Sequence, residues 1–291
     1  MGPSPFVAPH SGGTKLPRLV APLGACDCHM HFYDGRYPGM PGSIRQHSDA
    51  TVADYALLQQ RIGTKRVVVV TPSAYGTDNG PTLDGMAALG PHARGVAVVD
   101  TTVSDAELER LAAFGIRGIR FNFATPGPGP TSVDMMEPLA QRVAGLGMHL
   151  QLHVAGEQIV ELAPILKRST ATIVFDHMGR IPQPAGARHP AYGVIMRLVD
   201  AGRAWVKLSG AYHDTRMGPP DYTDTSVLAR AFAAAAPERV VWGSDWPHPS
   251  CESKPDDAVL FDLIASWIPS SAMQRRLLVT NPAELYGFDA V

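Results

Sequence analysis

The feature that most constrains this sequence is an alternation of short apolar runs with segments of helical pattern, repeated eight times along the chain. The runs are nearly continuous in apolar residues, which is typical of strands covered on both faces of a parallel sheet. They are Ala25–His31, Arg66–Ser73, Arg94–Asp100, Ile116–Phe123, His149–Val154, Thr172–His177, Trp205–Gly210 and Val240–Asp245. Eight such units close a barrel, so the pattern predicts an α/β fold of the (β/α)8 type. A doubly wound sheet stays open as an alternative, because periodicity reports local units and not closure.

Two of the helices between these runs carry recognisable start signals. Ser104 or Asp105 is placed to cap a helix over Asp105–Phe114. A second helix is predicted over Asp256–Trp267, where leucines and isoleucine recur on one face. Neither helix opens with a glycine-rich nucleotide loop.

Length and composition indicate one globular domain. The chain has 291 residues, of which 45% are hydrophobic and 18% charged, and its net charge of -2 predicts no attraction to nucleic acid or to a membrane surface. The three cysteines are too few and too close in CxC for a disulfide framework, so we expect reduced thiols and a cytoplasmic protein. Residues 1–24 are rich in proline and glycine and predict a flexible N-terminal arm before a catalytic barrel over residues 25–291.

Histidines gather at the predicted strand ends, where the active site of a parallel barrel lies. Six of the eleven fall there: His29, His31, His153, His177, His213 and His248. His29 and His31 form an HxH pair, and alternation along a strand sends both side chains to one face. A purely structural pair is the alternative for this short motif. Because other predicted strands also end in histidine or aspartate, a shared site is favoured over a purely structural pair.

Asp245 ends the last run, in GSDWPH, and is the candidate general base. The alternative is that its carboxylate caps the loop after the strand. Arg120 and Asn122 share one face of the fourth run, and Arg120 is suited either to hold a substrate carboxylate or to pair with Asp176 inside the barrel. Lys207 has the same two possible functions.

The second run is followed by a polar loop. Ser73 and Tyr75 lie in it and are candidates for contacts with substrate hydroxyls, although turn chemistry also explains such residues.

Taken together, the motifs CDCHMHFY, GTDN, RGIRFNF, DHMGR, GSDWPHP and VTNPAELYG identify a resemblance that covers almost the whole chain. The sequence resembles the lactone-acting branch of the amidohydrolase superfamily, which includes D-galactarolactone isomerase and 2-pyrone-4,6-dicarboxylate lactonase. The resemblance implies a single distorted (β/α)8 TIM-type barrel, with His29, His31 and His177 polarising a lactone carbonyl and Asp245 as the base. It also implies substrate contacts from Ser73, Tyr75, Arg120 and His248. Asn122, His153, Lys207 and His213 complete the candidate substrate-binding set.

The sequence departs from the pyrone-dicarboxylate lactonases at two kinds of position. Two arginines of those enzymes are missing from the neighbourhoods ATPGPG and SGAYHD, which favours a hydroxylated sugar-acid lactone over an aromatic-like dicarboxylate. His153 stands where those enzymes have a tyrosine. With His29, His31 and Asp245 it would complete a zinc ligand set. Relatives both with and without a metal exist, so a divalent ion and no cofactor are both open.

These residues predict an enzyme that isomerises or hydrolyses a lactone such as D-galactarolactone, with a pyrone-dicarboxylate-type lactonase as the alternative. A metal-dependent decarboxylase or hydratase of the same superfamily is a further alternative, and a non-catalytic sugar-acid binding protein is another. The partner expected is a small lactone. The oligomeric state is not predicted.

Overall fold

The computed structural model describes residues 6–41, 48–125 and 129–289. Its centre is an eight-stranded sheet in which every strand pairs in parallel with the next along the chain. The strands are β1 (Cys26–Met30), β2 (Arg66–Val70), β3 (Ala93–Ala97), β4 (Ile116–Asn122), β5 (His149–His153), β6 (Ile173–Phe175), β7 (Ala204–Leu208) and β8 (Val240–Trp242). All eight predicted strands are confirmed. The polar residues at the end of several runs belong to the following loops.

The sheet closes through the segment that follows β8, because β8 itself is short. The amide of Asp245 donates to the carbonyl of His29, and the amide of His31 donates to the carbonyl of Trp246, each at 2.8 Å. A parallel bridge between Met30 and Trp246 lies at the same place. The predicted barrel, distorted at this seam, is confirmed, and the doubly wound sheet is excluded.

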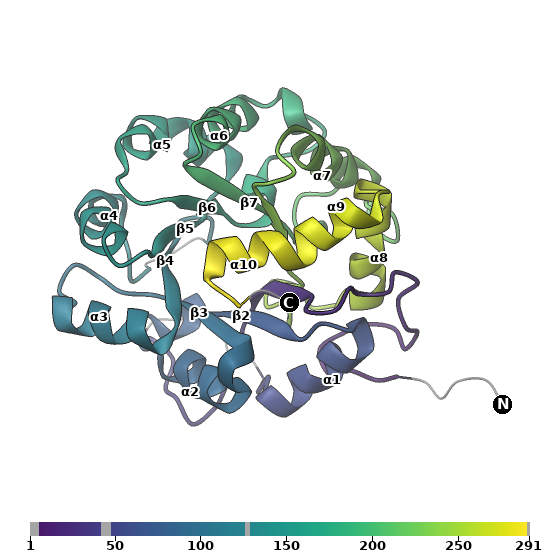
Figure 1. The fold of residues 1–291 in the computed structure, drawn as a ribbon, viewed down its shortest axis with the longest axis horizontal. Helices are drawn as coiled ribbons and strands as arrows, with labels where there is room; N and C mark the ends of the chain where they lie inside the picture. The colour runs from purple at the N-terminus through teal and green to yellow at the C-terminus, as the bar shows by residue number, and fades with distance from the viewer. Residues whose placement is uncertain (1–5, 42–47, 126–128, 290–291) are drawn as a thin grey trace.

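Helices surround the barrel in chain order (Figure 1). They are α1 (Val52–Ile62), α2 (Gly80–Leu89), α3 (Asp105–Phe114), α4 (Met136–Ala144), α5 (Gly156–Arg168), α6 (Pro190–Asp200), α7 (Thr223–Ala235), α8 (Asp257–Trp267), α9 (Ser271–Arg275) and α10 (Asn281–Tyr286). Ser104 caps α3 by accepting from the amide of Glu107, and Asp256 caps α8, which starts one residue later than predicted. None of the helices in the described ranges combines the length and apolarity that crossing a membrane requires.

One end of the barrel is covered by α10, which crosses it in the view of Figure 1. Tyr286 and Phe288 join an apolar cluster with Cys26 and Cys28 at the start of β1. This packing covers part of the end where the strands begin. Open space for a substrate is therefore expected at the opposite end, where the strands finish.

The chain before β1 contacts the barrel at several points. The side chain of Arg61 donates to the carbonyls of Gly12 and Lys15, each at 2.9 Å, and the indole of Trp246 donates to the carbonyl of Pro9 at 2.8 Å. Residues 1–5 of the predicted arm lie outside the described residues. The flexibility predicted for residues 1–24 stays a prediction, since contacts alone do not measure motion.

Candidate active site

Four histidines and one carboxylate, contributed by the ends of four strands, meet at the C-terminal end of the barrel. The imidazole centroids of His29 and His177 lie 4.7 Å apart, as do those of His177 and His213, and those of His29 and His31 lie 4.9 Å apart. Asp245 lies within this group and is almost fully buried. The residues that sequence reasoning placed at the ends of β1, β6, β7 and β8 are thus brought together.

The two oxygens of the Asp245 carboxylate have different surroundings. Oδ2 accepts hydrogen bonds from the Tyr212 hydroxyl at 2.6 Å and from Nε2 of His213 at 3.1 Å. Oδ1 faces the other imidazoles, and its distances to Nε2 are 3.4 Å for His31, 3.5 Å for His29 and 3.7 Å for His177. Oδ2 is therefore held by two hydrogen bonds, whereas Oδ1 faces the other three imidazoles.

Burial and charge set the protonation states of these groups. Burial lowers the pKa of His29 to about 3 and that of His177 well below its ordinary value. Burial acts in the opposite sense on Asp245, but His177 and the hydrogen bonds from His213 and His31 outweigh it, so that the pKa of Asp245 lies well below the ordinary value. At neutral pH the carboxylate is ionised, and His29 is neutral.

Partners on the far side of each ring fix the direction of Nε2. Nδ1 of His31 lies 2.8 Å from the carbonyl oxygen of Val70, and Nδ1 of His177 lies 2.9 Å from Oγ of Ser209. The carbonyl can only accept, so Nδ1 of His31 donates to it and Nε2 is directed at the ionised carboxylate of Asp245. A proton or a metal cation between Nε2 and the carboxylate oxygen stabilises this approach.

The donor atoms fit a divalent metal ion. Nε2 of His29, Nε2 of His31 and Oδ1 of Asp245 are mutually 3.3 to 3.5 Å apart. Tetrahedral zinc with bonds of about 2.0 to 2.1 Å separates its ligand atoms by about 3.3 Å. Groups of suitable ligands in the described part of the chain are His29–His31–Asp245, His29–Asp176–His177 and His177–His213–Asp245.

His153 was predicted to complete a zinc ligand set, and its metal contact stays a prediction. It belongs to none of the ligand groups found within the described ranges. Its Nε2 instead lies 3.2 Å from the guanidinium of Arg180, and burial together with the charge of Arg120 lowers its pKa well below the ordinary value. His153 ends its strand as His29 does, but a position at a strand end does not determine which neighbours the imidazole contacts.

A buried polar network around Asp176 includes Arg120 and Lys207, for which substrate binding and an internal ion pair were both open. Nε of Arg120 donates to Oδ2 of Asp176 at 3.3 Å, and the fully buried ammonium of Lys207 lies 3.4 Å from Oδ1 of the same carboxylate. Lys207 also lies 3.1 Å from Nδ1 of His29 and donates to Gln151 at 2.7 Å. Both cations pair with Asp176, and Lys207 has no exposed surface. The substrate contacts predicted for them stay predictions, and the geometry for such a contact is better for Arg120.

The predicted polar contacts from the second and fourth strands lie at the mouth. The amide of Asn122 donates to Oγ of Ser73 at 2.6 Å, which joins the ends of β4 and β2. The Tyr75 hydroxyl is engaged with the backbone of Asp34, from whose amide it accepts at 2.8 Å. Tyr75 also lines a cavity of about 370 Å³ together with Thr77 and Asp78. Their substrate contacts stay predictions.

Sequence reasoning missed Tyr212 and Asp257, which connect His248 to the cluster. His248 is fully buried; its Nδ1 lies 3.0 Å from the Tyr212 hydroxyl and its Nε2 lies 3.0 Å from Oδ2 of Asp257. Both ring nitrogens are thus engaged within the protein, and this arrangement does not support the direct substrate contact predicted for His248. The segment SGAYHD lacks an arginine of the pyrone-dicarboxylate lactonases, but its sequence does not indicate that Tyr212 contacts Asp245.

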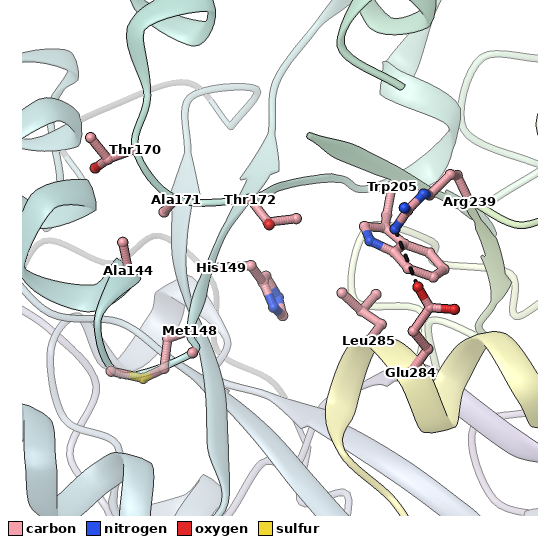
Figure 2. A pocket seen from close by; sticks show the side chains of 11 residues that line it. Ala144, Met148, His149, Thr170, Ala171, Thr172, Trp205, Arg239, Glu284 and Leu285 are labelled. Atoms are coloured by element: carbon pink, nitrogen blue, oxygen red, sulfur yellow. Dashed lines mark hydrogen bonds and ion pairs between the residues drawn. The ribbon is translucent and has the colours of Figure 1, made fainter. Parts of the chain in front are cut away.

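Another hollow, of about 310 Å³, lies at the opposite end of the barrel (Figure 2). Arg239 and Glu284 form an ion pair of 3.4 Å on its wall, and His149 lies inside. Nε2 of His149 is buried with no hydrogen-bond partner among the residues that the structure describes, and it faces the backbone of Gly118, where a Cβ would stand 2.4 Å away. This hollow does not expose the imidazole nitrogen, so the cluster around Asp245 is the better candidate for catalysis.

Comparisons with known proteins find similar chains that match this one over nearly its whole length. The amidohydrolase family model matches residues 26–288. The chain is 33% identical to D-galactarolactone isomerase of Agrobacterium fabrum, over 94% of this chain and 95% of that protein. It is 34% identical to a 2-pyrone-4,6-dicarboxylate hydrolase of Comamonas testosteroni, over 93% and 92% of the two chains. A crystal structure of an Agrobacterium tumefaciens protein in its apo form has a TM-score of 0.89 and 32% identity, and the likeness covers 97% of this chain and 99% of that one.

Proposed function

Because the chain belongs to the amidohydrolase family, we propose that it is an enzyme acting on a sugar-acid lactone of the galactarolactone kind, with Asp245 as its general base. The observation that carries the proposal is the position of Asp245 Oδ1, which faces Nε2 of three imidazoles at 3.4 to 3.7 Å where the strands end. An ionised carboxylate beside several nitrogen groups suits acyl transfer, since one accepts a proton while the others stabilise negative charge.

In this reaction an oxygen nucleophile attacks the lactone carbonyl carbon. Asp245 Oδ1 takes the proton of the attacking hydroxyl, and the imidazoles of His29, His31 and His177 stabilise the oxyanion of the tetrahedral intermediate. When the intermediate collapses, the ring carbon–oxygen bond breaks and the proton passes from Asp245 to the leaving alkoxide. Water as nucleophile gives the open acid. A hydroxyl of the substrate gives a lactone of another ring size.

The distribution of cations favours a hydroxylated substrate with few carboxylates. Asp214 holds Arg180 through two bonds of 2.7 and 3.1 Å, and Lys207 is buried against Asp176. Arg120 uses Nε for Asp176, and no partner within the described residues occupies its terminal nitrogens. One carboxylate clamp is therefore available, which suits a sugar-acid lactone better than an aromatic-like dicarboxylate.

We further propose that His29, His31 and Asp245, with His177 beside them, would hold a divalent ion such as zinc. When bound, such an ion would act as a Lewis acid toward the substrate carbonyl oxygen. The fit of the ligand distances supports this set, and His153 is left to the substrate side of the pocket. The three unpaired cysteines support the cytoplasmic location expected from the sequence.

The test is to incubate the purified chain with a panel of aldaric acid lactones and to follow ring size and ring opening by NMR. We expect a change of ring size as the first event. Release of open-chain diacid as the first product would replace the isomerase by a lactonase. Absence of turnover on every lactone, including the pyrone dicarboxylate, would reject a lactone-acting enzyme.

A metal-dependent decarboxylase or hydratase is the second candidate, because the same ligand set suits that chemistry. It predicts release of carbon dioxide or addition of water to a double bond. Full turnover of a lactone after exhaustive chelation would exclude it.

A further inference from the structure

A chain of hydrogen bonds leads from the general base to a buried acid at the start of α8. Asp245 Oδ2 accepts from Tyr212, whose hydroxyl oxygen lies 3.0 Å from Nδ1 of His248, and Nε2 of His248 lies 3.0 Å from Oδ2 of Asp257. His248 and Asp257 have no exposed surface. This hydrogen-bonded series reaches Oδ2 of Asp245, and the ring of Tyr212 packs beside that of His213, with 4.6 Å between the two ring centroids.

The number of available protons determines which group donates in each of these hydrogen bonds. The Tyr212 hydroxyl has one proton, and at 2.6 Å from an ionised carboxylate it donates that proton to Asp245. Its oxygen must then accept from Nδ1 of His248. A further proton lies between Nε2 of His248 and Asp257, since a hydrogen bond at 3.0 Å requires one. The pair of His248 and Asp257 therefore orients the tyrosine hydroxyl toward Asp245.

The backbone at Asp245 and His248 has an uncommon conformation that the surrounding structure must hold in place. Asp245 has φ of 63° and His248 has φ of 56°, both in the left-handed region that non-glycine residues rarely adopt. Such residues persist where their surroundings hold them, and the amide of His248 donates to the carbonyl of Asp245 at 2.7 Å. Asp257 lies in the first turn of α8, where the helix dipole favours a negative charge.

We propose that Tyr212 is a positioning residue that fixes the Asp245 carboxylate, with the His248–Asp257 pair orienting the tyrosine hydroxyl. By holding Oδ2, Tyr212 keeps Oδ1 directed at the reacting atoms. The inference rests on the proposed function, in which Asp245 Oδ1 exchanges the proton. His213 also donates to Oδ2, but a single donor leaves the carboxylate free to turn about its Cβ–Cγ bond.

The first experiment measures kcat and KM of wild type and four variants on the preferred lactone. Tyr212→Phe removes only the hydroxyl, and we expect kcat to fall tenfold to a hundredfold with KM within threefold. Asp257→Asn should lower kcat by less. In the double variant Tyr212→Phe/Asp257→Asn, kcat should equal that of Tyr212→Phe, because Asp257 acts through Tyr212. Tyr192→Phe is the matched control: its hydroxyl bonds the carbonyl of Ala231 away from the site, and it should match wild type.

A general structural effect would lower stability and raise KM, and its two single effects would multiply in the double variant. An unchanged kcat of Tyr212→Phe in an active wild-type background overturns the proposal, and so does multiplication of the two effects. If Asp257→Asn does not fold, His248→Gln replaces it in the same cycle.

Crystal structures of wild type and Tyr212→Phe test the proposal without any substrate. A turned Asp245 carboxylate in the variant supports positioning, and an unchanged orientation overturns it. If wild type turns over no lactone, the proposed function fails, while this structural comparison still decides whether Tyr212 positions Asp245.

Discussion

Nε2 of His31 lies 3.4 Å from Oδ1 of Asp245, while Nδ1 of the same ring is directed at the carbonyl oxygen of Val70. Because that carbonyl can only accept, Nδ1 of His31 donates to it, and the other ring nitrogen is directed at the carboxylate. His29 and Asp245 repeat this approach at 3.5 Å. The Nε2–Oδ1 distances leave room for a cation between nitrogen and oxygen, which makes metal uptake a direct test of the cluster.

We expect wild type to retain about one zinc ion per chain after equilibration with zinc and gel filtration. His31→Asn should retain much less, because it removes one of the three closely spaced ligand atoms. His153→Asn is the matched control and should retain as much as wild type, since His153 lies in none of the ligand groups of the described residues. Elemental analysis measures the stoichiometry. Equal loss of zinc in both variants would show that His153 is also a ligand. If wild type retains no zinc, the imidazoles alone stabilise the oxyanion.

Replacement of Asp245 by asparagine should remove the proton acceptor while it preserves the shape of the side chain. We expect kcat on the lactone to fall by about 100- to 10,000-fold, the usual contribution of a general base. Binding of a non-reacting lactone analogue, measured by calorimetry, should change little. Asp221→Asn on the exposed surface serves as the control. Retention of wild-type kcat in Asp245→Asn would move the base elsewhere.

Arg120→Gln should weaken binding of lactones that carry a carboxylate. The loss of a charge-assisted hydrogen bond is worth about 1.5 to 3 kcal/mol, so KM should rise about tenfold to a hundredfold. A lactone of the same ring without the carboxylate is the matched control, and its kcat/KM should be the same for wild type and variant. Equal losses on both lactones would show that Arg120 acts only through its ion pair with Asp176.

Much of this site follows from the order and the alternation of the sequence. The HxH pair of His29 and His31 and the final Asp245 end strands of one parallel barrel, and parallel strands must end at the same face. The eight strands were predictable for the same reason, because each is a local apolar run covered on both sides.

The rest of the site depends on side-chain directions that no local pattern records. Tyr212 lies in a loop after β7 and Asp257 opens α8, so their meeting with His248 is set only by tertiary packing. Likewise, the alternation of β7 predicts that Lys207 points into the barrel. Its complete burial, which the pattern does not predict, places the ammonium beside Asp176 and away from solvent.

The last prediction concerns His149, the buried imidazole at the start of β5. Burial and the nearby charge of Lys207 lower its pKa from 6.5 to about 3, so the folded chain keeps it neutral. The unfolded chain binds a proton below about pH 6.5, and the stability that His149 contributes above that pH is lost as the pH falls toward 3. Between pH 7 and pH 5 this one group should lower the free energy of unfolding by about 2 kcal/mol.

His149→Gln should abolish that part of the pH dependence, because glutamine does not titrate. Urea unfolding at pH 7 and pH 5 measures the difference, and the variant should lose about 2 kcal/mol less than wild type over this range. Contributions from the active-site histidines are common to both chains and cancel in the comparison. The exposed His92, replaced by glutamine, is the control and should leave the pH dependence as it is. An identical loss for wild type and His149→Gln would mean that the buried imidazole binds its proton equally well in the folded and unfolded chains.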